Sequence, residues 1–286
     1  TDSQIDNHFS QGKKEIKITN PISSDLNVLR TSIFSNLIIY LKKNQDRGYL
    51  DLSLFEIGPV FFGKKPGEQQ TVVGGLKSGM INRKSWEGKP RNVDVFDVKV
   101  DAIKTLVELG LDENSLYVSN KSQDHYNPGR SGSINLKSEN GPILAFFGEI
   151  HPAILSTLDL KEQIVSGFEI FLKNMPEPIK KYRFTKKDYS ISEFQKSERD
   201  FAFIIDNEFK AGDVKEIISQ ADPNLIKKVK IFDVFSGGNM PEGKKSIAIN
   251  VTIQSMEKTL SQKDLDQVSQ KIINVVKTKT GGTIRS

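Results

Sequence analysis

The sequence has no cysteine, only one tryptophan and three histidines among its 286 residues. Without cysteine there can be no disulfide, zinc–thiolate site, iron–sulfur cluster or thiol nucleophile, which is compatible with the cytoplasm, where we expect the protein to work. The three histidines, His8, His125 and His151, are far apart and lack the spacing of metal ligands. The sequence therefore predicts no metal site and no bound cofactor.

Long apolar runs and common catalytic motifs are missing as well. No stretch approaches the roughly 18 apolar residues of a membrane span, and no signal peptide is visible. There is neither a P-loop nor a G-x-S-x-G elbow. Glu56 and Glu149 each follow an apolar run and form no evident acid–base pair, so we expect them to be solvated or to cap an element. No catalytic residue is predicted.

The overall composition, 36% apolar and 27% charged, is that of an ordinary globular chain with room for two domains. Residues 1–174 hold 21 basic and 21 acidic side chains, so the whole net charge of +5 lies in residues 175–286. That bias favours a polyanionic partner for the later part of the chain, although weakly. The sequence begins at Thr1 without a methionine and becomes regular quickly, so we expect a fragment of something longer.

Residues 1–174 show many strands and few helices, which predicts a mainly antiparallel sheet. The first helix is expected to begin at a cap among Ser23, Ser24 and Asp25, with an apolar face that includes Leu26 and Leu29. Asn127–Arg130 is expected to be a tight turn at the surface. The other predicted elements are a buried strand at 50–62, a strand at 69–79 in which Gly74 and Gly75 mark close backbone approach or a bulge, a strand that passes into a helix at 93–110, a hairpin at 131–150 with a short helix after it, and a last strand at 164–174.

Residues 175–188 are basic and contain proline, and we interpret them as an inter-domain linker. Residues 189–286 follow the order βαββαβ of a ferredoxin-like domain. The fold class predicted for the whole chain is therefore α+β, a mainly antiparallel sheet domain followed by a ferredoxin-like one. The expected elements of the second domain are strand 199–205, helix 211–221, strands 228–235 and 245–254, helix 261–278 with Ser261 and Asp264 at its cap, and a short final strand.

Alternation along the strands of the second domain gives its sheet two unlike faces. The bulky face must be covered by the two helices, and we expect Phe201, Phe203, Phe232, Ile247 and Ile249 on it. The other face is left open, with Phe235 as its single aromatic residue. An uncovered face with small residues, a carboxylate and one aromatic ring is a plausible binding surface for a nucleobase. Its predicted members are Ala202, Asp233, Phe235, Ser246 and Ala248.

Other interpretations of this face stay open. Asp233 could be paired with Arg199 or Arg285, and the linker or the first domain could cover Phe235. Ferredoxin-like folds also form regulatory and assembly modules whose open face binds protein rather than RNA. The salt dependence of binding would separate these classes, because phosphate contacts release counterions.

Several motifs, in order and over nearly the whole chain, resemble the C-terminal part of the bacterial phenylalanyl-tRNA synthetase β subunit family. They are LNVLRTSIFSNLI, LFEIGPVF, NPGRSG, FFGEIHP, FEIFL, SERDFAF, IFDVFSG, KKSIAINVTIQ, TLSQKDL and GGTIR. The resemblance implies that the first domain has the class II synthetase fold as an inactive copy and that the second is a ferredoxin-fold anticodon-binding domain. The F-R-x-E loop of a working class II site is absent, and the strand SGFEIFLKN has no ATP-binding arginine. The fragment is thus expected to be inactive alone.

The resemblance also implies partners and site residues. The partners are phenylalanine tRNA and the α subunit of an α2β2 ligase, and the full enzyme uses ATP and magnesium. The α subunit is expected to contact the LNVLRTSIFSNLIIYL helix and the strands after it. The family's tRNA-contacting positions carry over to Ala202, Asp233, Phe235, Ser246 and Arg285. Phe235 would stack on the first anticodon base, Asp233 and Ser246 would contact its polar edge, and Arg285 would hold a phosphate or stack. Many relatives have tyrosine in place of Phe235.

Overall fold

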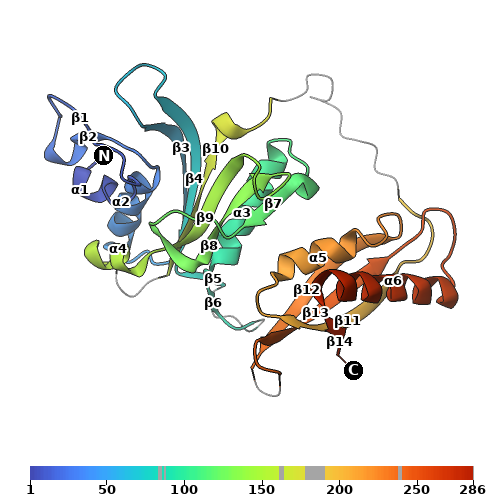
Figure 1. The fold of residues 1–286 in the computed structure, drawn as a ribbon. Coiled ribbons are helices and arrows are strands. Elements are labelled where there is room, and N and C mark those ends of the chain that lie inside the picture. Colours follow the sequence, from blue (N-terminus) through green and yellow to red (C-terminus); the bar gives the residue numbers. More distant parts are fainter. Residues whose placement is uncertain (83–85, 87, 161–163, 178–190, 238–239, 286) are drawn as a thin grey trace. The chain divides into compact units, whose positions relative to one another are not determined.

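The computed structural model describes residues 1–286 except 83–85, 87, 161–163, 178–190, 238–239 and 286 (Figure 1). The chain divides into two compact units, Thr1–Arg183 and Phe184–Ser286, called here the first and second unit. The predicted linker at residues 175–188 lies outside the described residues from position 178 onward, so its bounds stay a prediction.

The first unit is built on a six-stranded sheet with the order β3-β4-β10-β9-β8-β7, and every neighbouring pair in it is antiparallel. Helix α3 covers one face and helix α2 the other, each with its own apolar core (Figure 1). The elements are α1 Ser3–Asp6, β1 Ile16–Lys17, β2 Val28–Leu29, α2 Phe34–Gln45, β3 Leu52–Phe61, β4 Gln69–Ser78, β5 Met80–Asn82, β6 Arg91–Asn92, α3 Val95–Glu108, β7 Leu116–Ser119, β8 Tyr126–Leu136, β9 Ile143–Ile150, α4 Pro152–Thr157 and β10 Val165–Phe171.

Strand β4 lies between the two helices, and its adjacent glycines let each of them come close. A Cβ at Gly74 would overlap Ile33 at the start of α2, and a Cβ at Gly75 would overlap the ring of Phe168 beneath α3. Of the two roles predicted for these glycines, close approach is the one that the structure shows, because β4 pairs with both of its neighbours through them without a register shift. Strand β3, however, is an edge strand rather than a buried one, and its Phe55 and Ile57 are exposed.

Helix α2 begins at Phe34, eight to ten residues later than a cap at Ser23, Ser24 or Asp25 predicted. Ser24–Leu26 form a 3-10 turn, and Val28–Leu29 pair with β1 instead of continuing a helix. The cause is a pair of buried carboxylates from distant parts of the chain. Asp6 accepts hydrogen bonds from the backbone N of Thr31 (3.0 and 3.2 Å) and from its hydroxyl (2.9 Å). These bonds replace a local cap, so the start of the helix could not be found from local sequence alone.

Glu169 of β10 is the second of these carboxylates. It accepts hydrogen bonds from the hydroxyl of Ser32 and from the backbone N of Ile33, both at 2.8 Å. Burial raises the pKa of Glu169, and the two hydrogen bonds act in the opposite direction. Strand β10, the third of the six strands in the sheet order, is therefore hydrogen-bonded directly to the start of α2.

Two further expectations for the first unit were wrong because they depended on contacts between strands. Asn127–Arg130 does not form a turn between elements; it is an irregular stretch of β8, where Gly129 has φ +80°. Glu149 is buried rather than solvated, and Arg130 donates to both of its carboxylate oxygens at 3.1 and 3.2 Å. Residues of neighbouring strands thus satisfy a carboxylate that looked isolated in the sequence. Glu56 likewise forms an ion pair with Arg30.

His125 is buried among aromatic rings, with Phe9, Phe34 and Tyr126 at centroid distances of 4.2–5.6 Å. The amide of Gln11 lies 2.9 Å from its Nδ1. Burial lowers the pKa of the imidazole from 6.5 to about 3, because a charged ring would lose its hydration there. His125 therefore has a structural role, as a neutral ring within the core.

This burial predicts a pH dependence of stability. Below pH 6.5 the unfolded chain gains a proton on His125 that the folded chain does not bind, so stability falls as the pH falls toward 3. Between pH 7 and pH 5 the first unit should lose about 2 kcal/mol through this residue. Urea unfolding followed by hydrogen exchange in β9 would measure the loss, which should be absent in His125→Gln. His8→Gln is the control, and equal pH dependence in all three chains would refute the assignment.

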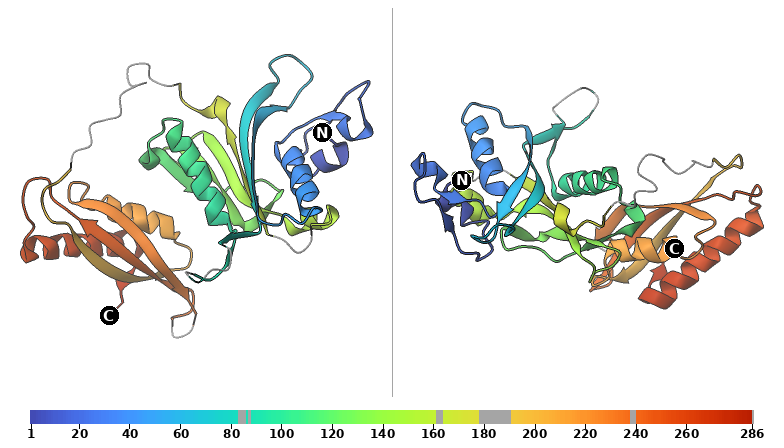
Figure 2. Two further views of the ribbon diagram at one scale, coloured as in Figure 1. Left: turned by 180° about the vertical axis from the view of Figure 1, so that it is seen from behind. Right: turned by 90° about the horizontal axis from the view of Figure 1, so that it is seen from above.

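The second unit is a ferredoxin-like fold, as the sequence predicted. Its sheet has the order β12-β13-β11-β14, all antiparallel, and α5 and α6 pack on one face of it (Figure 2). Ser261 and Asp264 form the predicted capping box at the start of α6, and Gly281 ends that helix with φ +67°. The elements are β11 Ser197–Asp206, α5 Ala211–Ser219, β12 Ile226–Ser236, β13 Lys244–Ile253, α6 Gln262–Thr280 and β14 Thr283–Ile284.

The core of the second unit lies between the helices and the bulky face of the sheet. Phe201, Phe203 and Ile205 of β11 are buried there, and the alternate residues of β13 from Ile247 to Ile253 join them. The helices complete this core with Val214 and Ile218 of α5 and with four apolar residues of α6. Among the described residues of the second unit, no helix packs on the opposite face of the sheet, so alternation correctly predicted which face the helices of this unit leave uncovered.

Candidate nucleic-acid interface

Strand pairing arranges the open face as rows of side chains that run across the sheet. One row holds Ala202 of β11, Ala248 of β13 and Asp233 of β12, which are direct cross-strand partners. The backbone N of Arg285 donates to the carbonyl of Ala202 at 2.7 Å, so the residue after β14 extends this row to the far edge. Two alanines thus separate an acidic side chain at one end from a basic one at the other.

The next row holds Ile204 of β11, Ser246 of β13 and Phe235 of β12. Adjacent rows on one face are two residues apart along each strand, or roughly 7 Å. The register therefore brings the five residues predicted as a site into two neighbouring rows, although they come from four strands or strand ends. Because hydrogen-bonded strands carry these residues, the distances between them are fixed more tightly than they would be on loops.

Exposure differs among these five residues. Phe235 has 45% of its surface exposed, Asp233 and Arg285 are exposed, and Ala202 is half-buried. Ser246 is only 5% exposed, because it is a small residue between the larger Ile204 and Phe235 of its own row. A ligand on this face would meet the ring, the carboxylate and the guanidinium first.

The carboxylate of Asp233 is available for a ligand. Among the described residues it forms no ion pair, and Arg199, one of its possible partners, instead donates to Gln262 of α6 at 3.0 Å. An ionised carboxylate accepts hydrogen bonds and donates none, so it suits a ligand edge that presents N–H groups. An exposed ring beside it offers a flat surface for stacking.

The structure corrects the sequence prediction at Phe232. This residue was expected on the helix-covered face, but it is 54% exposed and lies on the open face. The register shifts between the pairs Ile231–Ile249 and Asp233–Ala248, so Phe232 is the extra residue of a β-bulge. Because a bulge resets the alternation, two successive residues of β12 point to the same side.

A signal for this bulge is present in the sequence. Val229 and Ile231 set one phase of apolar alternation in β12, and Val234 sets the opposite phase. No single phase can place all three on the bulky face without a break between positions 231 and 234. The open face therefore carries two aromatic residues, Phe232 and Phe235, not one.

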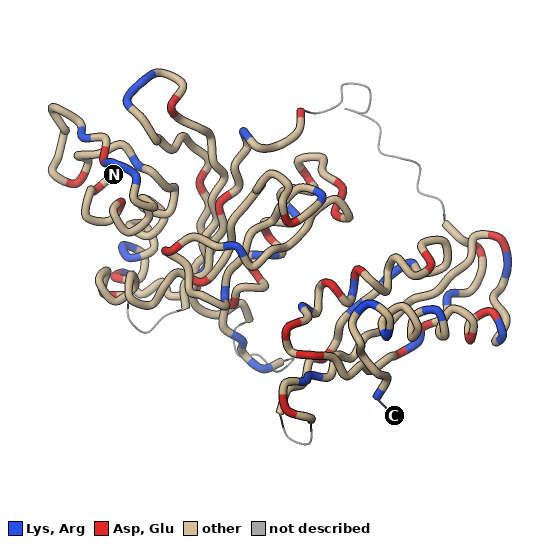
Figure 3. Tube along the Cα trace, in the orientation of Figure 1, with Lys and Arg blue, Asp and Glu red and all other residues tan. Residues whose placement is uncertain are grey.

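Among the described residues, no three His, Asp or Glu side chains are grouped so as to hold a metal ion. Within the same residues, no helix is long and apolar enough to cross a membrane. Lys and Arg are spread over both units (Figure 3), so the chemistry of the open face depends on local pairing rather than on one large basic surface.

Comparison with known proteins gives matches over both units. A family model described as "Phenylalanyl tRNA synthetase beta chain CLM domain" matches residues 1–172, and one described as "Ferredoxin-fold anticodon binding domain" matches residues 192–285. The chain is 42% identical over 277 residues to the "Phenylalanine--tRNA ligase beta subunit" of Paramagnetospirillum magneticum, and 39% identical over 281 residues to the protein of that name from Bartonella quintana. Each alignment covers 97% of this chain.

The matched relatives are much longer than this chain, which spans 34% and 35% of their lengths. A solved structure titled as a pyrrolysyl tRNA synthetase from Desulfitobacterium hafniense is similar at 12% identity with a TM-score of 0.42, covering 60% of this chain and 57% of that one. The two family models together match most of both units, and the ferredoxin-fold model includes Arg285, the last of the five predicted site residues.

Proposed function

Because this chain belongs to the phenylalanyl-tRNA synthetase β chain family, we propose that it is a non-catalytic part of phenylalanine–tRNA ligase. Its second unit binds the anticodon region of phenylalanine tRNA. Its first unit is a scaffold for the catalytic α subunit, as part of an α2β2 enzyme in the cytoplasm. Together they allow the ATP-dependent charging of tRNA with phenylalanine.

The observation that carries this proposal is the pair of rows on the open face. Phe235 stacks on the first anticodon base, since its ring is exposed and stands at the end of a row of smaller residues. Asp233, in the next row, accepts from the N–H donors on the polar edge of that base; guanine presents two of them, at N1 and N2. Ser246 assists from beneath the ring, and Arg285 holds a phosphate at the opposite edge of the sheet.

The cofactors of the reaction belong to the partner in this proposal. The described residues of this chain provide no cluster suited to magnesium, and two of its carboxylates, Glu56 and Glu149, form ion pairs with Arg30 and Arg130. ATP, magnesium and phenylalanine would therefore be used at the active site of the α subunit.

The contact with the α subunit is expected to lie at the strands after α2 rather than at that helix. Helix α2 directs Phe34, Leu37 and Leu41 into the core, so little of its apolar surface is left for a partner. The following edge strand β3 exposes 78% of Phe55 together with Ile57 on one face. Large apolar side chains exposed side by side in this way mark an interaction surface.

Replacing Phe235 with alanine tests the RNA-binding function. The variant should bind phenylalanine tRNA about 5- to 150-fold more weakly, because stacking contributes about 1–3 kcal/mol per base. It should also lose the preference of the native chain for the intact anticodon over a substituted one. Fluorescence-anisotropy titrations would measure both effects.

Phe55→Ala is the matched control, because it removes an exposed phenylalanine from the other unit. The rival function, a regulatory or assembly module that binds protein, predicts no anticodon preference. It also predicts no steep fall of RNA affinity with salt, since only phosphate contacts release counterions. Equal binding of both RNAs by the native chain would favour that rival.

A further inference from the structure

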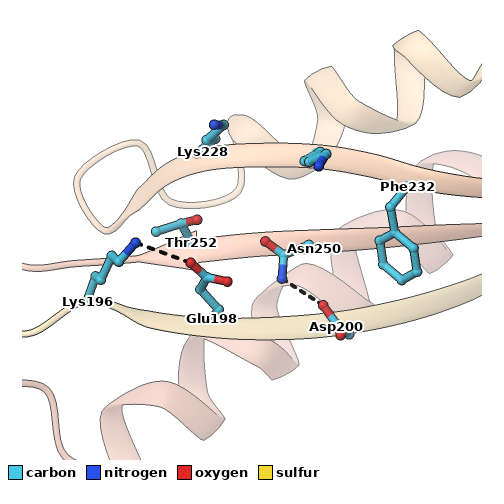
Figure 4. A pocket seen from close by; sticks show the side chains of 8 residues that line it. Lys196, Glu198, Asp200, Lys228, Phe232, Asn250 and Thr252 are labelled. Atoms are coloured by element: carbon cyan, nitrogen blue, oxygen red, sulfur yellow. Dashed lines mark hydrogen bonds and ion pairs between the residues drawn. The ribbon is translucent and has the colours of Figure 1, made fainter. Parts of the chain in front are cut away.

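The open face continues beyond the two rows described above into a groove of about 510 Å³ (Figure 4). It lies on the side of the sheet away from the helices, and the ring of Phe232 stands at one end of it. The other lining residues are polar or charged: Lys196, Glu198, Asp200, Lys228, Lys230, Asn250 and Thr252.

The acidic side chains of this groove already have partners. Lys196 pairs with Glu198 at 3.4 Å, and the amide of Asn250 donates to Asp200 at 2.7 Å (Figure 4). Lys228 and Lys230 of β12, by contrast, form no ion pair within the part of the chain that the structure describes. Two lysine side chains without an ion-pair partner among the described residues therefore precede the exposed ring of Phe232 along β12.

The groove and the predicted base site form one surface. In the pairing of β12 with β13, Lys230 is the cross-strand partner of Asn250, and Asp233 is that of Ala248. Their rows are therefore consecutive on the open face. Phe232, the bulge residue, lies between these two rows. Neighbouring rows are two residues apart along a strand, or roughly 7 Å. The ring of Phe232 is therefore close enough to the rows of Asp233 and Phe235 for adjacent nucleotides of one RNA to contact both places.

We propose that Phe232, Lys228 and Lys230 form a second nucleotide subsite, which holds the base adjacent to the one stacked on Phe235. Phe232 provides the stacking surface, and the two lysines hold the connecting phosphate. An aromatic ring beside unpaired basic side chains in a polar groove is the usual composition of a surface for single-stranded nucleic acid. The bulge creates this subsite, because without it Phe232 would point into the core. The inference rests on the proposed RNA-binding function.

The test uses the full 286-residue chain and anticodon stem-loop RNAs that carry 2-aminopurine at one loop position each, since stacking changes the fluorescence of this base. Phe235→Leu should abolish the change at one position. Phe232→Leu should abolish it at an adjacent position and weaken binding by at least about 5-fold. Phe232→Tyr, which keeps the ring, should restore both.

A charge experiment tests the lysines separately. The double variant Lys228→Gln/Lys230→Gln should reduce the slope of log affinity against log salt by about 0.7, because the two lysines together hold one phosphate and each neutralised phosphate of a single strand contributes roughly that much. The matched control is Lys277→Gln/Lys279→Gln, two exposed lysines on α6 at the same spacing, and it should leave the slope unchanged.

Failure of this subsite and failure of the proposed function give different results. If Phe235→Leu alters the RNA signal and Phe232→Leu alters nothing, the subsite is refuted and the base site stands. If the native chain binds none of the RNAs, both are refuted. A change at the same loop position in both variants would also refute a separate subsite.

Discussion

Truncation of Phe203 to alanine is expected to lower the free energy of unfolding of the second unit by about 3–5 kcal/mol. The ring is 1% exposed, lies at the centre of the core beneath the helices and stacks on Phe201 at a centroid distance of 6.0 Å. Its removal leaves a cavity that neighbouring β-branched residues cannot fill. Hydrogen exchange resolved by peptide would show the loss in β11 and β13, because exchange reports local and global opening.

The matched control is Phe232→Ala, the same substitution on the opposite face of the same sheet. Since that ring is 54% exposed and lies in a bulge, its truncation should cost less than about 1 kcal/mol. The protection of the first unit should not change in either variant, because its cores share no residue with that of the second unit. Equal losses for Phe203 and Phe232 would contradict the assignment of the two faces.

Asp6→Ala is expected to destabilise the first unit by about 3 kcal/mol. This buried carboxylate accepts from the backbone and hydroxyl of Thr31 and from the hydroxyl of Ser35, so alanine would leave several buried donors without acceptors. It also removes the tie between α1 and the start of α2. Urea unfolding of the two chains, followed by hydrogen exchange in α2, would measure the cost.

Asp6→Asn separates the hydrogen bonds from the rest of the side chain. Asparagine keeps the shape and one acceptor oxygen but turns the other into a donor that faces other donors, so an intermediate loss is expected. If Asp6→Ala and Asp6→Asn were both as stable as the native chain, the carboxylate would not be what fixes the entrance of α2.

Periodicity in the sequence was enough to predict the second unit almost completely. Each of its strands and helices was predicted with bounds within a few residues, because alternating β-branched residues such as Ile247 and Ile249 can be buried on one side only. The cap of α6 is local and was predicted as well. The start of α2 was not, since its hydrogen bonds come from Asp6 and Glu169, which are remote in sequence.

The candidate site shows the same division between local and non-local information. Alternation predicted the open face, and the register brings Ala202, Asp233, Phe235, Ser246 and Arg285 into two neighbouring rows. That they bind RNA stays a prediction. Phe232 was misplaced because a bulge depends on how β12 pairs with β13, and a rule that follows one strand at a time assumes an unbroken period.

The two irregularities of β12 also affect self-association. This strand is at the edge of its sheet, where unpaired backbone groups could recruit the same strand of another copy. Its bulges interrupt the regular ladder near Lys227 and at Phe232, and three lysines within four residues, at 227, 228 and 230, would repel an identical strand. The opposite edge, β14, has only two residues. A long, exposed edge strand is thereby kept from starting an aggregate while its face stays bare for a ligand.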